Sequence, residues 1–175
     1  MNKRRLFFAL WPPSSVVRAV KQTIKQLYPE GLPGSMVKPD NYHLTLQFLG
    51  PVNQQQFDCA CQQAERVQFT PFHLTLEQSG YWQGPRVAWL APAEVPVALE
   101  TMVKQLQEGL ADCGFEAMHP AYRPHLTIAR KVQYLQAQSC SPISWPVEEF
   151  ALVESHTWPE GVQYKVIGRW PASQD

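Results

Sequence analysis

The hydrophobic pattern along the first fifty residues predicts a strand, a helix and a second strand. Residues 5–11 form an apolar run rich in aromatic residues, which predicts a buried strand. After a turn at residues 12–15, where a serine is placed to cap a helix, apolar residues recur at helical spacing up to Leu27. Residues 42–49 alternate again in the way that is typical of a strand.

The same order of elements recurs in the second half of the chain. Residues 86–92 predict an apolar strand, Leu99 to Leu110 predict an amphipathic helix, and residues 125–130 predict a further strand. Residues 5–50 and 86–131 are therefore predicted to be matched strand–helix–strand units. We expect a single bilobal domain over residues 1–175 with an internal repeat.

Each unit ends in the pattern His-x-Thr-x, and this is the candidate chemistry of the chain. Along a strand, residues two positions apart point to the same side, about 6.6–7 Å apart. His43 therefore shares a face with Thr45, and His125 shares a face with Thr127. If the lobes are related by a pseudo-twofold axis, the two polar faces meet across a cleft.

A third tetrapeptide of this kind, at residues 73–76, needs a separate interpretation. Aligning the two halves places His73 opposite Ala151, outside the paired units. We therefore interpret it as a coincidental strand pattern.

Composition limits the kinds of partner. Apolar residues make up 45% of the chain and charged residues 17%, which argues against a disordered chain or a coiled coil. The 15 Lys+Arg balance the 15 Asp+Glu. A broad cationic surface for nucleic acid is therefore excluded, whereas a small local phosphate site remains open.

Two further features predict the cellular compartment. Residues Cys59, Cys61, Cys113 and Cys140 form no CxxC pair, so we expect reduced thiols in a cytoplasmic protein. The apolar run near the N-terminus is too short for a signal peptide or a spanning helix. We expect a soluble protein with no membrane partner.

Two histidines and two threonines around one small volume suit phosphoryl chemistry. With an unperturbed pKa near 6.5, one imidazole can accept a proton while the other donates one. Threonine hydroxyls can donate to phosphoryl oxygens. His119 and His125 lack the HExxH context of a zinc site, and this scheme requires no metal and no cofactor.

Residues 42–50 and 123–130 resemble the paired signatures of the two-histidine (2H) phosphoesterase superfamily. Within it, the chain most resembles the LigT-like bacterial RNA 2',3'-cyclic phosphodiesterases, also called 2'-5' RNA ligases. The resemblance implies an α+β fold in which two antiparallel sheets flank a central cleft with helices outside. It also implies metal-independent opening of RNA 2',3'-cyclic phosphate ends to 2'-phosphates.

The resemblance further implies roles for single residues. His125 corresponds to the base that activates water, and His43 corresponds to the acid that protonates the departing 3'-oxygen. Thr45 and Thr127 would hold the phosphate. The reverse direction, with an RNA 5'-hydroxyl as nucleophile, would give ATP-independent 2'-5' ligation.

Arg130 and Phe48 each lie five residues after a histidine and are candidate substrate-binding residues. Strict alternation puts Arg130 on the face opposite His125, so it reaches the phosphate only if the strand bends. Phe48 is placed either to stack on a nucleobase or to pack in the core.

The expected partners are RNA ends, such as short or single-stranded RNA or tRNA halves, bound by a monomer. Two alternatives stay open: a phosphodiesterase acting on a small cyclic nucleotide, and a nucleotide-binding module without turnover.

Overall fold

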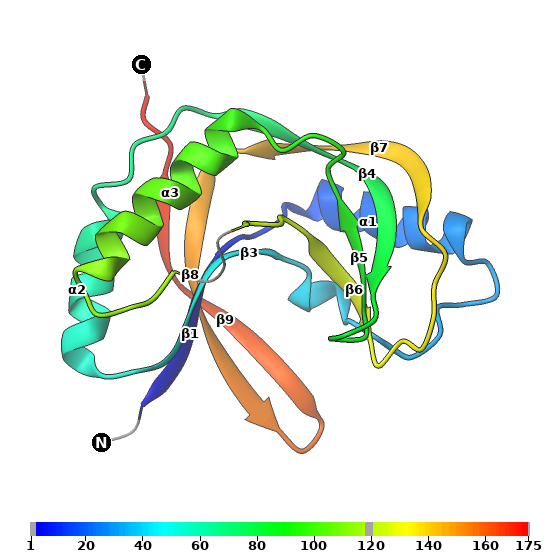
Figure 1. Ribbon diagram of the computed structural model, residues 1–175, viewed down its shortest axis with the longest axis horizontal. Coiled ribbons are helices and arrows are strands. Elements are labelled where there is room, and N and C mark those ends of the chain that lie inside the picture. The colour runs from blue at the N-terminus through cyan, green and yellow to red at the C-terminus, as the bar shows by residue number, and fades with distance from the viewer. Residues whose placement is uncertain (1–2, 118–120, 175) are drawn as a thin grey trace.

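The computed structural model describes residues 3–117 and 121–174, which form helices packed on antiparallel strands (Figure 1). This architecture confirms the predicted α+β class. In chain order the elements are β1 (Arg4–Leu10), α1 (Ser14–Leu27), β2 (Ser35–Met36), η1 (Pro39–Asn41), β3 (Leu44–Val52), α2 (Gln54–Ala64), β4 (Phe72–Trp82), β5 (Val87–Ala91), α3 (Val97–Ala111), β6 (Leu126–Arg130), β7 (Gln138–Val147), β8 (Glu149–Trp158) and β9 (Gly161–Pro171).

The strands follow one continuous order that narrows at its centre. The order is β7-β4-β5-β6-β3-β1-β8-β9, with β2 paired to β6. In the described chain, β3 and β6 are joined through one residue pair, Leu44 with Leu126. The two predicted sheets are thus two half-sheets, β7-β4-β5-β6 and β3-β1-β8-β9, that meet at this pair.

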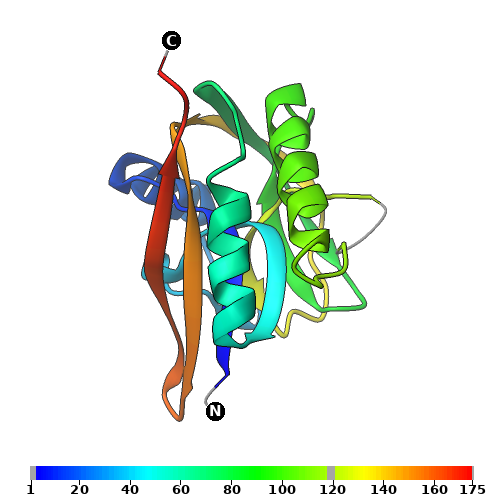
Figure 2. The same cartoon turned by 90° about the vertical axis from the view of Figure 1, so that its left-hand side faces the viewer.

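Helices α1 and α3 each pack on the half-sheet that does not contain the strand before them. α1 follows β1 but packs against β7, and α3 follows β5 but packs against β3 with α2 beside it. Figures 1 and 2 show α2 and α3 together, and Figure 1 shows α1 on the opposite side of the molecule. Each half-sheet is therefore covered by a helix that begins in the other half. None of the helices in the described residues is long and apolar enough to cross a membrane.

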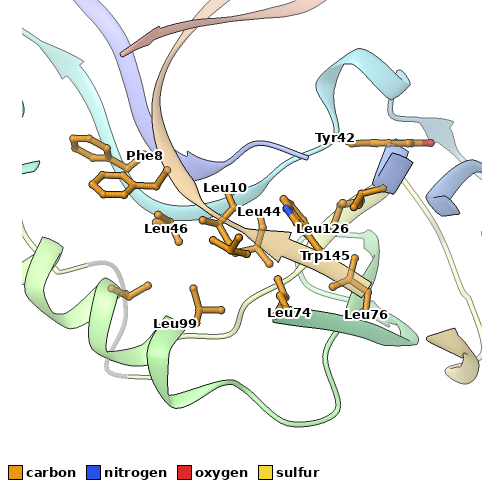
Figure 3. Close-up of a cluster of buried hydrophobic side chains, with 14 of the residues drawn as sticks. Phe8, Leu10, Tyr42, Leu44, Leu46, Leu74, Leu76, Leu99, Leu126 and Trp145 are labelled. Carbon is orange, nitrogen blue, oxygen red and sulfur yellow. The ribbon is translucent and has the colours of Figure 1, made fainter. Parts of the chain in front are cut away.

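Strand β1, which lies between β3 and β8, has buried residues on both of its faces. Phe8 and Leu10 belong to the main core, where Leu44 and Leu126 also lie (Figure 3). Phe7 belongs to a second, smaller cluster on the opposite face. Burying each such side chain contributes about 1.5–3 kcal/mol, so both faces of β1 are fixed by packing.

Three local features differ from the sequence prediction or are absent from it. Pro13, not a serine, occupies the N-cap of α1, with no side-chain cap hydrogen bond. α2 was not predicted because it is rich in glutamine, although its Asn53–Gln56 capping box is a readable start signal. β7 was also not predicted; Ile143, Trp145 and Val147 alternate along it as buried residues.

The prediction of four reduced thiols is wrong for one pair. Cys59 in α2 and Cys113, just after α3, form a disulfide, whereas Cys61 and Cys140 are unpaired. The two bonded residues are separated by 54 positions in the sequence. Only the packing of α2 on α3 brings them together, and sequence spacing does not reveal that packing.

Candidate active site

The Leu44–Leu126 pair fixes where the two candidate histidines lie. Each histidine directly precedes its strand, His43 before β3 and His125 before β6. Both leucines are fully buried, so the residues on either side of them point to the opposite face, away from the core. Extending this register by one residue makes the two histidines diagonal neighbours, whose Cβ atoms are typically about 7–8 Å apart or less.

The same register sets each histidine directly opposite the threonine of the other unit. It sets His43 opposite Thr127 and His125 opposite Thr45. Two cavities have this crossed composition. One, of about 480 Å³, is lined by His125 and Thr45 and is called the His125 cavity. The other, of about 440 Å³, is lined by His43 and Thr127 and is called the His43 cavity.

Both imidazoles are held in the same way by the backbone two residues earlier. Nδ1 of His43 donates to the carbonyl oxygen of Asn41 at 2.7 Å, and Nδ1 of His125 donates to that of Arg123 at 2.8 Å. Because a carbonyl only accepts, Nδ1 carries the proton in each neutral ring. Nε2 is therefore the atom of each ring that is able to exchange a proton with a ligand.

Aromatic rings surround His43. The His43 ring centroid lies 4.9 Å from that of Phe7, 5.1 Å from that of Tyr164 and 5.7 Å from that of Trp11, which stacks on it. This burial lowers the pKa of His43 to about 4, helped by the positive charge of Arg130 and opposed by the hydrogen bond to Asn41.

His125 has a less enclosed setting. The ring of Trp82 contacts it edge-on with centroids 4.5 Å apart. Burial lowers the pKa of His125, the hydrogen bond to the Arg123 carbonyl opposes that shift, and Arg130 lowers the pKa further. Both imidazoles are therefore neutral at neutral pH before a ligand binds.

A β-bulge changes the expected orientation of Arg130. Thr127 pairs with Trp89 of β5 and Ala129 pairs with Ala88, so Ile128 is an extra residue in β6. The extra residue shifts the alternation, and Arg130 lines the His43 cavity instead of lying on the far side of the strand.

The His43 cavity is locally cationic although the chain has no net charge. Lys38, Arg130 and Lys131 line it together with one carboxylate residue, Glu160. The approach of β2 to β6 depends on Gly34, where an added Cβ would lie 2.4 Å from the Arg130 carbonyl oxygen. A glycine at this point lets the segment that carries Lys38 close one side of the cavity.

Phe48 is an exposed aromatic residue at the edge of the site. Its exposed fraction is 56%, and it lines the His125 cavity as well as a third cavity of about 420 Å³. Its ring lies 5.8 Å from that of Phe7. The core-packing alternative is therefore wrong, and nucleobase stacking stays a prediction.

Of the other histidines that the structure describes, neither His73 nor His156 lines the two cavities. His73 is exposed on β4, where its Nδ1 is 3.1 Å from Ser144 Oγ. His156 pairs with Glu154 at 3.3 Å on the surface. His119 lies outside the described residues. Within residues 3–117 and 121–174, no group of three or more metal-ligating side chains occurs.

Sequence reasoning missed Tyr122, which ties the two halves of the site together. Its hydroxyl donates to the Thr45 carbonyl oxygen at 2.9 Å. Burial raises the pKa of Tyr122, so the phenol remains a donor. The sequence shows only that Tyr122 lies three residues before His125. It does not reveal the hydrogen bond, because the carbonyl that accepts it belongs to the other unit.

The comparisons with known proteins agree with this architecture. The fold superimposes on the crystal structure of E. coli LigT complexed with 3'-AMP with a TM-score of 0.88, at 29% identity, covering 99% of this chain and 100% of that one. Two antiparallel half-sheets, each covered by helices, define a protein of the LigT-like 2H phosphoesterase fold.

Sequence similarity defines the family. Residues 10–157 match the family described as the 2'-5' RNA ligase superfamily. The chain is 30% identical to the RNA 2',3'-cyclic phosphodiesterase of Escherichia coli (strain K12), over 98% of both chains. It is also 30% identical to the enzyme of that name from Thermotoga maritima, over 93% of this chain and 92% of the relative. The chain belongs to the 2'-5' RNA ligase superfamily.

Proposed function

We propose that the protein opens 2',3'-cyclic phosphate ends of RNA to 2'-phosphates, with His43 and His125 as acid and base. The observation that carries the proposal is the matched pair of imidazoles, each fixed through Nδ1 and each facing the threonine of the opposite unit. A site that only bound nucleotides would not need two proton-transfer groups. The names of the relatives in E. coli and Thermotoga maritima support the same activity.

The proposed hydrolysis begins at His125. Its Nε2 takes a proton from water while the water oxygen forms a bond to phosphorus. The bond between phosphorus and the 3'-oxygen breaks, and His43 Nε2–H gives its proton to that oxygen. The product carries a 2'-phosphate and a 3'-hydroxyl, and proton exchange with solvent restores both rings. Proton transfers of this kind typically contribute about 10²–10⁴-fold each.

The acid must gain its proton when the substrate binds. The lowered pKa of His43 reflects burial without a counter-charge. A phosphodiester anion beside the ring supplies that charge, which raises the pKa of the imidazole. Substrate binding is thus coupled to uptake of a proton.

The remaining groups hold the phosphate and the nucleotide. In this proposal Thr45, which lines the His125 cavity, and Thr127, which lines the His43 cavity, donate to the non-bridging oxygens, and Arg130 supplies positive charge from the His43 cavity. Phe48 offers an exposed ring on which a base can stack. Both proton transfers and the charge stabilisation come from side chains, so the proposed reaction needs no metal ion.

The proposal extends to RNA ligation and to the cellular setting. If an RNA 5'-hydroxyl replaces water as the nucleophile, the same attack gives a 2'-5' linkage without ATP. The acid and base exchange roles when the reaction runs backward. We propose that a monomer acts in the cytoplasm on short or single-stranded RNA ends, including tRNA halves.

The test is to incubate the protein, in the presence of EDTA, with a labelled short RNA that ends in a 2',3'-cyclic phosphate. The expected result is complete conversion to a 2'-phosphate end. A 3'-phosphate product would reverse the leaving group, and inhibition by EDTA would indicate a metal enzyme. Turnover of cyclic mononucleotides alone would favour the small-nucleotide alternative, and tight binding without turnover would favour a binding module.

A further inference from the structure

Gln107, which lines the His125 cavity, has a buried amide nitrogen for which the described residues supply no hydrogen-bond partner. The residue lies on α3 and lines the cavity, and among the described residues no acceptor contacts its Nε2. A buried donor left without a partner costs about 1–3 kcal/mol. Such a group is retained at a cost and needs an explanation.

Gln105 gives the contrast on the same helix. Its Oε1 accepts from the Gln68 backbone nitrogen, and its Nε2 donates to the Gln68 carbonyl, both at 2.9 Å. That amide has a structural role, since it ties the loop after α2 to α3. The Gln107 amide nitrogen has no comparable contact within the described chain.

The cavity beside Gln107 has the walls that a flat aromatic ligand needs. It has a volume of about 480 Å³, and the aromatic residues Phe48, Trp82 and Tyr122 line it. Ligand pockets of this type combine apolar walls with a few polar groups that fix orientation. It also contains His125, so a group bound there would adjoin the reacting phosphate.

We propose that the His125 cavity receives the terminal nucleobase and that the Gln107 amide hydrogen-bonds to the edge of that base. The proposal rests on the proposed function, because it places the base of that same substrate. The terminal torsion of glutamine is broad, so a small rotation presents either amide atom to the cavity. One donor and one acceptor complement the adjacent donor and acceptor that every nucleobase carries on its pairing edge.

The chemistry of the amide predicts a selective effect of Gln107→Glu. A carboxylate only accepts hydrogen bonds, so it suits guanine, which offers two adjacent N–H donors. It opposes uracil, whose single N–H lies between two carbonyl oxygens. The loss of one hydrogen bond corresponds to about a tenfold change. The ratio of kcat/KM for guanosine over uridine 2',3'-cyclic phosphate is therefore expected to rise about tenfold or more.

A second variant measures the dependence on any base. Gln107→Leu is compared on nucleoside 2',3'-cyclic phosphates and on methyl riboside 2',3'-cyclic phosphate, which lacks a base. The nucleoside-to-riboside ratio of kcat/KM is expected to fall about tenfold with the lost hydrogen bond. Gln105→Leu is the matched control on the same helix, and it should leave that ratio unchanged.

The outcomes separate this inference from the proposed function. Turnover with unchanged base ratios in both Gln107 variants would overturn the base pocket and leave the activity intact. If the protein turns over none of these small substrates, the pocket is tested by the affinities of 3'-GMP and 3'-UMP. An unchanged 3'-GMP to 3'-UMP affinity ratio in Gln107→Glu would then overturn it. The proposed function itself fails only if an RNA that ends in a 2',3'-cyclic phosphate is not turned over either. Thermal melting of each variant shows that it is folded.

Discussion

The two halves of the candidate site share one backbone frame but have different walls. In each half a histidine donates from Nδ1 to the carbonyl two residues earlier, and a buried leucine follows it into a strand. Around His43, however, lie three aromatic rings and a cation-lined cavity, whereas around His125 lie one tryptophan and a largely apolar cavity.

This difference shows that the orientation of each imidazole and its pKa are set by different parts of the molecule. The repeated motif fixes where each imidazole points, because its hydrogen bond and its neighbouring leucine are local to the sequence. The burial that lowers the pKa of each ring comes instead from distant elements, among them β1 and β9 around His43 and the end of β4 around His125. The same backbone arrangement with different surrounding side chains therefore allows two histidines to have different proton affinities.

The largest expected effect comes from removing either ring. His43→Ala and His125→Ala should each lower kcat on a 2',3'-cyclic phosphate end by about 10²–10⁴-fold, because each removes one proton transfer. His73→Ala is the control, since this third His-x-Thr motif lies exposed on β4, apart from both cavities. Equal losses in all three variants would show that the motif has a structural role only.

A smaller effect is expected from Arg130, whose positive charge lowers the pKa of both imidazoles. Arg130→Met should lower kcat/KM by about 10–100-fold, the usual value of a hydrogen bond to a charged group. Arg130→Lys should recover part of that loss because the charge is kept. Arg66→Met, at an exposed arginine outside the site, is the control. A loss in the Arg66 variant as large as that in Arg130→Met would assign the effect to overall charge.

The pH dependence of the free energy of unfolding tests how the surroundings of His43 and His125 affect their pKa values. The pKa of His43 is lowered to about 4 in the folded protein, from the usual value near 6.5. The unfolded chain therefore binds more protons than the folded one in this range, and stability that is full above pH 6.5 is lost as the pH falls toward 4. The loss amounts to up to about 3 kcal/mol.

His43→Gln should flatten this part of the profile, measured as the free energy of unfolding in urea between pH 7 and 4. His125→Gln should flatten it as well, because burial lowers the pKa of that ring too. If neither variant changes the slope, burial does not control the protonation of the two rings.

The sequence predicted the elements that carry the motifs better than the surroundings of the motifs. Alternation and spacing located the strands after His43 and His125, because both depend on local burial. They placed Arg130 on the wrong face, because a bulge at Ile128 is set by pairing with β5. Similarly, a disulfide partner such as Cys113 depends on how two helices pack, which no local pattern records.

Of the residues that line the candidate site, sequence reasoning singled out the polar motif residues and Phe48 but not the other aromatic residues. The four motif residues are visible because polar side chains interrupt apolar strands. The rings of Trp11, Trp82 and Tyr164 are indistinguishable in sequence from core aromatics. Their role follows only from the distances that the fold sets.

The most direct test of two histidines acting as acid and base uses a substrate whose bridging 3'-oxygen is replaced by sulfur. A thiolate leaves without protonation, so the variant that lacks the acid should regain activity and the variant that lacks the base should not. His43→Ala is expected to approach the wild-type rate on this substrate, while His125→Ala remains impaired by about 10²-fold or more. Equal impairment of both variants on the oxygen and sulfur substrates would contradict the account.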